Sequence, residues 1–125
     1  MRIKHILFYW LPVYLYMGLI FYLSGQSPSP YFAPLPYDKL IHFLEYALLG
    51  FFLIRAMRIT FSHHNLAVLS VAAVVIAGIY GASDEFHQGF VPGRSPDMLD
   101  WAADSLGAAA AVLIISKRKI REKSA

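Results

Sequence analysis

The chain has 125 residues, enough for one domain, and contains no cysteine, which excludes disulfides and thiolate chemistry. Its hydrophobic fraction is 58% and only 15% of its residues are charged, which argues against a soluble globular domain. The net charge of +3 comes largely from a basic tail directly after an apolar stretch. Such a tail indicates contact with an anionic membrane surface and not with nucleic acid.

Four apolar stretches predict an all-α polytopic membrane protein, a bundle of four transmembrane helices in a single domain over residues 1–125. A transmembrane helix needs about 20 mostly apolar residues. The stretches run over about 6–23, 40–54, 66–83 and 98–116. The first is too long and too aromatic for a signal peptide, and no cleavage pattern follows it, so we expect an uncleaved helix.

The basic residues between the apolar stretches predict the orientation. Nine Lys and Arg residues precede the first stretch or follow the second and the fourth, whereas only Lys39 and Arg94 lie on the other side. The positive-inside rule then predicts a protein of the cytoplasmic (inner) membrane with both termini in the cytoplasm.

Seven of the eight carboxylates gather at the predicted outer end, several of them inside sequence that is otherwise typical of membrane spans. Spacings of three and four residues place them on shared helix faces. One face holds Asp38, His42 and Glu45, and another holds Asp97, Asp100 and Asp104. A third group ends the third stretch and comprises Asp84, Glu85, His87 and Gln88. We therefore expect one outer polar pocket shared by three helices.

A structural role competes with a ligand site for some of these acids. Asp38 and Asp97 stand at helix starts, where a carboxylate caps free N–H groups. Glu45, Asp84 and Asp104 lie deeper, and a carboxylate inside a membrane span is a functional candidate by default.

The residues predicted to bind a ligand share this outer end. They are Asp38, Lys39, His42, Glu45, Asp84, Glu85, Gln88, Arg94, Asp97, Asp100 and Asp104. Arg94 and the start of the fourth helix are suited to an anionic head group, because guanidinium binds phosphate in bidentate fashion and a helix start favours anions.

Three motifs in order carry a family resemblance. They are Asp38-Lys39-x-x-His42-Phe43, then Asp84-Glu85-x-x-Gln88, then Gly93-Arg94 followed by Asp97 and Asp100-x-x-x-Asp104. Over roughly residues 24–115 the chain closely resembles the VanZ-like family. Asp104 stands where many relatives carry asparagine.

The resemblance implies a multi-pass membrane protein linked to antibiotic resistance, since the founding member is associated with resistance to the glycopeptide teicoplanin. We expect a non-enzymatic cell-envelope factor that binds an amphiphilic or anionic envelope ligand. The expected partners are membrane lipids together with a lipid-linked cell-wall precursor or an envelope protein, and no nucleic acid.

An enzyme is the alternative: a metal-dependent hydrolase or transferase acting on phospholipid or polyprenyl phosphate. A divalent cation held by Asp84, Glu85, Asp100 and Asp104 would be its cofactor. The candidate catalytic residues are His42, Glu45 and His87. Ion transport ranks last, because polar residues confined to one half of the helices outline no path across the membrane.

Overall fold

The computed structural model describes residues 3–26 and 38–124, with side chains described as far as residue 119. This part of the chain contains no strand and forms four helices: α1 (Ile3–Ser24), α2 (Asp38–Thr60), α3 (Leu66–Gln88) and α4 (Met98–Ser124). Each helix is long and apolar enough to cross a membrane. The predicted all-α bundle of four transmembrane helices is therefore confirmed, and the protein is a multi-pass membrane protein.

Three helices extend well beyond the apolar stretches that predicted them. α2 continues past residue 54 to Thr60, α3 continues past residue 83 to Gln88, and α4 continues past residue 116 to Ser124. Hydropathy marks only the segment suited to hydrocarbon, whereas backbone hydrogen bonding continues into the charged residues that follow. The extension of α3 places two acids, Asp84 and Glu85, within a helix.

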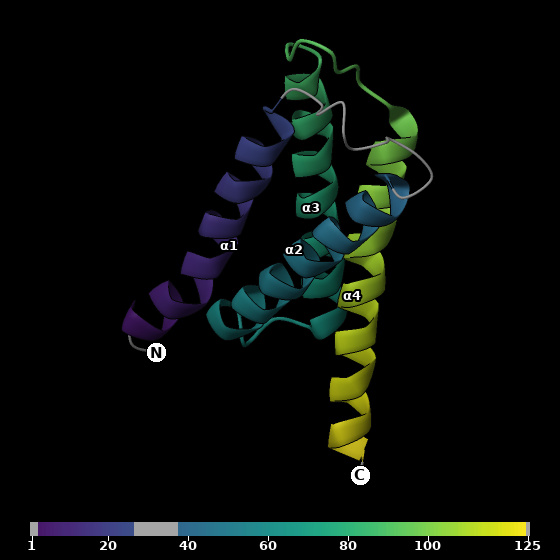
Figure 1. Cartoon of the computed structure of the whole chain (residues 1–125). Helices are drawn as coiled ribbons and strands as arrows, with labels where there is room; N and C mark the ends of the chain where they lie inside the picture. The colour runs from purple at the N-terminus through teal and green to yellow at the C-terminus, as the bar shows by residue number, and fades with distance from the viewer. Residues whose placement is uncertain (1–2, 27–37, 125) are drawn as a thin grey trace.

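The helices run back and forth, so both termini lie at one end of the bundle and the connection between α3 and α4 lies at the other (Figure 1). We call the end with the α3–α4 connection and the start of α2 the acidic end. The end with both termini and the α2–α3 turn is the basic end. This division places every acid of the three motifs at one end of the molecule.

α2 and α4 approach each other so closely that glycine is required between them. A Cβ atom on Gly107 would collide with the carbonyl oxygen of Phe43, and one on Gly50 would lie 2.8 Å from the carbonyl oxygen of Ala108. Small residues allow this close helix contact within membranes. Because Phe43 follows His42, the contact brings the polar face of α2 against that of α4.

The basic end is joined by neutral hydrogen bonds and apolar packing. The indole Nε1 of Trp10 donates to Thr60 Oγ1 at 2.6 Å, and the buried hydroxyls of Ser70 and Ser116 lie 2.7 Å apart. Large apolar side chains cover the outer surfaces of the helices, for example Leu15, which is 65% exposed. Such surfaces are suited to lipid.

Candidate functional site

The acidic end contains a buried polar cluster built from α2, α3 and α4. Its members are the predicted site residues with at most 7% of their surface exposed: His42, Asp84, Glu85, Gln88, Asp100 and Asp104. Burying an ionised group costs several kcal/mol unless partners compensate it, on the order of the whole stability of a small domain. The partners of these side chains therefore decide what the cluster can do.

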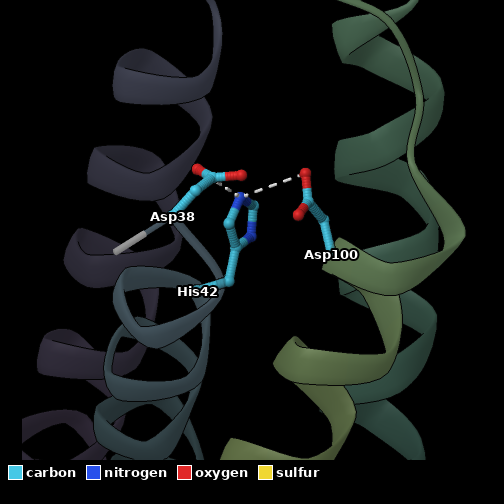
Figure 2. A group of neighbouring side chains, drawn as sticks. All are labelled: Asp38, His42 and Asp100. Atoms are coloured by element: carbon cyan, nitrogen blue, oxygen red, sulfur yellow. Dashed lines mark ion pairs between the residues drawn. The ribbon is translucent and has the colours of Figure 1, made fainter. Parts of the chain in front are cut away.

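His42 lies where α2 faces α4. Its Nδ1 is 2.8 Å from Asp104 Oδ1, and its Nε2 is 3.5 Å from Asp100 Oδ2 and 3.8 Å from Asp38 Oδ1. Figure 2 shows Asp38 and His42 pointing toward Asp100 on the neighbouring helix. The imidazole therefore has carboxylates on both of its nitrogen sides, where it can exchange protons or hold a cation.

Lys39 neutralises the outermost acids. Its ammonium group lies 2.8 Å from Asp97 Oδ2 and 3.6 Å from Asp38 Oδ2, and it also forms an ion pair with Asp100. The hydrogen bond from Lys39 holds the pKa of Asp97, which lies just before the membrane-spanning part of α4, below its ordinary value. The charge of Lys39 is thus committed to three acids of the protein itself.

Asp97 also caps α4, as its position predicts. Its Oδ1 accepts from the N–H of Leu99 at 2.8 Å, and its own N–H donates to Glu85 Oε2 at 2.9 Å. The N–H groups of Asp100 and Trp101 bind the carbonyl oxygen of Asp97. With these donors occupied, the start of α4 offers less to an anion than its sequence suggested.

The Asp84 side of the cluster is completed by α1. Ser24 Oγ donates to Asp84 Oδ1 at 2.5 Å and lies 3.4 Å from His87 Nδ1, while the His87 ring stacks on Phe21 with centroids 4.1 Å apart. Ser24 was not predicted as a site residue. The available signal was its place at the end of the first apolar stretch, level with the acids.

The remaining predicted residues keep unused hydrogen-bonding groups. Among the described residues, no side chain binds the carboxylate of half-buried Glu45 or the amide of Gln88. Arg94 donates from Nε to the carbonyl oxygen of Gln26 at 2.7 Å and acts electrostatically on Glu45 and Asp84. It forms no ion pair with any carboxylate in the part of the chain that is described.

Residues that could hold a metal form two overlapping groups, and in each group the ligand atoms lie within 4.8 Å of one another. They are Asp38, His42 and Asp100 in the first group and His42, Glu85 and Asp104 in the second. The four acids proposed from the sequence as one metal site are thus divided. Asp84 belongs to neither group, because it faces Ser24 on α1.

Two hollows in the described structure lie away from the cluster. One of about 610 Å³ is at the basic end, where Arg55, Arg58 and His64 line it, and one of about 490 Å³ lies along α3 beside Val71. The members of the polar cluster at the acidic end are instead buried, each at most 7% exposed. The partly exposed rim of this end consists of Asp38, Lys39, Arg94 and Asp97.

The fold and the cluster define a class: multi-pass membrane proteins with ionisable residues concentrated in one half of a small helix bundle. Residues 2–119 match the family model described as VanZ/LLP1, and the chain belongs to this family. The resemblance found in the sequence is therefore confirmed. No curated protein and no solved structure matches the chain.

Proposed function

We propose that the chain is a cell-envelope binding protein whose acidic end holds the anionic head group of an amphiphilic ligand, such as a lipid-linked cell-wall precursor. The contrast between the two cations at this end carries the proposal. Lys39 is committed to three acids, whereas the guanidinium of Arg94 uses Nε on a backbone carbonyl and has no ion pair among the described residues. Its terminal nitrogens suit a phosphate or carboxylate.

Exposed apolar side chains near Arg94 in the sequence support an amphiphile over a fully polar ligand. Phe86 and Phe90 are 71% and 75% exposed, with ring centroids 5.3 Å apart, and Met98 is 75% exposed. These residues lie just before and after Arg94 in the sequence, at the end of the bundle where the head group would bind. They would contact the hydrocarbon chain of a ligand whose head group meets the guanidinium.

The binding test uses purified protein in detergent and native mass spectrometry with a polyprenyl phosphate, with phosphatidylglycerol and phosphatidylcholine as comparisons. Arg94→Gln is expected to weaken polyprenyl phosphate binding about tenfold or more, because a charge-assisted bidentate contact is lost. Arg58→Gln, at the basic end, is the matched control and should bind normally. Equal binding by Arg94→Gln and the wild type contradicts the proposal, as does equal binding of phosphatidylcholine.

Tolerance to teicoplanin is the cellular part of the proposal. A membrane protein that holds a cell-wall precursor would reduce what the glycopeptide can capture. Expression in a susceptible Gram-positive host should raise the inhibitory concentration of teicoplanin, and Arg94→Gln at equal abundance should not. If Arg94→Gln raises the inhibitory concentration as much as the wild type does, this site does not cause the tolerance.

The proposed location is the cytoplasmic (inner) membrane, with both termini in the cytoplasm and the acidic end outside. The nine-to-two distribution of Lys and Arg supports this orientation, and the termini lie at one end of the bundle (Figure 1). Reporter fusions after Gly93 should report the outer side, and a fusion at Ala125 the cytoplasm. An external C-terminus contradicts the orientation.

A further inference from the structure

Glu85 and Asp104 meet beside His42 in the interior of the bundle, and each comes from a different helix. Their ligand atoms lie within 4.8 Å of one another, and the residues are 6%, 0% and 7% exposed. Two carboxylates and one imidazole at this separation match the ligand types that bind divalent transition-metal ions.

Each of the two carboxylates has one oxygen occupied and one without a partner. Glu85 Oε2 accepts from the N–H of Asp97 and Asp104 Oδ1 lies at His42 Nδ1, whereas Glu85 Oε1 and Asp104 Oδ2 are buried with no hydrogen bond. Buried polar atoms in native proteins almost always have a partner, so two orphan oxygens in one group require an explanation. A bound cation supplies it for both.

The neighbouring group in Figure 2 already has its cation, which distinguishes it from the deeper one. Asp38 and Asp100 share the ammonium group of Lys39, which the figure does not draw. No Lys or Arg forms an ion pair with Glu85 or Asp104 in the described part of the chain. The deeper group is therefore the one that lacks a positive partner other than His42.

We propose that Glu85, Asp104 and His42 Nδ1 bind one divalent transition-metal ion. The opposite ring nitrogen supports this assignment, because Nε2 faces Asp100 Oδ2 at 3.5 Å and Asp38 Oδ1 at 3.8 Å. A metal-binding histidine usually directs its other N–H to a carboxylate, which fixes the ring and its tautomer. A nitrogen ligand beside two oxygens favours Zn²⁺ or Mn²⁺ over Ca²⁺ and Mg²⁺, which prefer oxygen alone.

This site goes beyond the proposed head-group site and does not rest on it. A cation at Glu85 and Asp104 would reduce the repulsion that these acids exert on an anion at Arg94. Cation binding is nevertheless measured without any lipid ligand, so either proposal can fail while the other stands.

The test is isothermal titration of chelator-treated full-length protein in detergent with ZnCl₂ and with MnCl₂, followed by metal analysis after desalting. The wild type should bind one equivalent of at least one of these ions. Glu85→Gln and Asp104→Asn keep the side-chain shape and remove a charged ligand, so each should weaken that binding about tenfold or more. Helix content and gel-filtration profile establish that each variant is folded.

Two controls decide where the ion binds. The adjacent histidines of the α2–α3 turn are replaced together, His63→Ala with His64→Ala, and Asp97→Asn removes an acid that is already paired with Lys39. Both control proteins should still bind one equivalent of the metal ion. The assignment is overturned if neither Glu85→Gln nor Asp104→Asn weakens binding, or if the double histidine variant abolishes it. Absence of saturable Zn²⁺ and Mn²⁺ binding by the wild type overturns it as well, even if a ligand variant proves unfolded.

Discussion

The two ends of the bundle hold their helices together by different means. At the basic end, neutral hydrogen bonds join Trp10 with Thr60 and Ser70 with Ser116, and the guanidinium of Arg55 on α2 lies 4.6 Å from the ring centroid of Tyr9 on α1. At the acidic end, most of the buried polar side chains are ionisable, and α2, α3 and α4 each contribute some of them. The same helices are therefore joined by hydroxyl and indole groups at one end and by carboxylates at the other.

The difference indicates that helix association alone does not require the buried acids. Neutral hydrogen bonds join these helices at far lower desolvation cost than ionised groups. The acidic end also leaves hydrogen-bond acceptors unused, because Glu85 Oε1 and Asp104 Oδ2 are buried without a hydrogen-bond partner. Such a pattern is typical of a site that holds something other than its own side chains.

The largest expected effect is at the close contact between α2 and α4, which holds the two helices together. Gly107→Val would drive a side chain into the backbone of Phe43, and the α2–α4 contact would have to open. Overpacking in a core costs about 1–3 kcal/mol, and a clash with backbone should reach or exceed the upper value. We expect little folded protein in the membrane, measured as abundance and as thermal stability after extraction.

Gly18→Ala on α1 is the matched control, because a Cβ atom there meets nothing within 4 Å. Its stability should stay within about 0.5 kcal/mol of the wild type. Normal abundance and stability of Gly107→Val would contradict the close α2–α4 contact, and with it the meeting of the acids on these helices.

The helices of this fold could be predicted from the sequence because hydrocarbon imposes a simple length and polarity requirement. The apolar stretches that begin at residues 66 and 98 match the starts of α3 and α4. The continuation of α2 to Thr60 could not be predicted from hydropathy, since charged residues continue a helix once it leaves the hydrocarbon. Helical spacing also predicted that the acids of each helix share a face.

Pairings between helices were beyond the sequence, because they depend on how the helices rotate and cross. The spacing could not tell that Lys39 would bind Asp97 and Asp100, or that Ser24 would complete the site from α1. Nor could it divide the acids into one group that contains Lys39 and a deeper group that does not. Those assignments require coordinates.

Two substitutions, one at each end of the bundle, compare the roles of the two ends, and their expected effects are of intermediate size. Ser116→Ala removes a buried interhelical hydrogen bond at the basic end and should cost about 0.5–1 kcal/mol of stability without changing polyprenyl phosphate binding. Asp84→Asn keeps an acceptor for Ser24 and removes a buried negative charge, so its stability should be nearly unchanged. Polyprenyl phosphate binding at Arg94 should become tighter, because one of the acids that repel the anion is neutralised.

Thermal unfolding in detergent and native mass spectrometry measure the two quantities on the same samples. If Asp84→Asn loses as much stability as Ser116→Ala and binds ligand normally, the acidic end is only a second means of joining helices.

The smallest expected effect concerns Asp97 at the rim, where charge and capping can be separated. Asp97→Asn keeps the acceptor for the N–H of Leu99 and loses the ion pair with Lys39, whereas Asp97→Ala loses both. Because Lys39 holds the pKa of Asp97 below 3.8 in the folded protein, the charged form contributes stability above that pH. This contribution is lost only as the pH falls through the lower, folded pKa.

The melting temperature of Asp97→Asn should therefore lie slightly below that of the wild type at pH 7, and the difference should shrink when both are measured below pH 3.8. Asp97→Ala should keep a deficit at both pH values, since a missing cap does not titrate. A difference between Asp97→Asn and the wild type that is the same at both pH values would show that the Lys39 pair does not contribute to it.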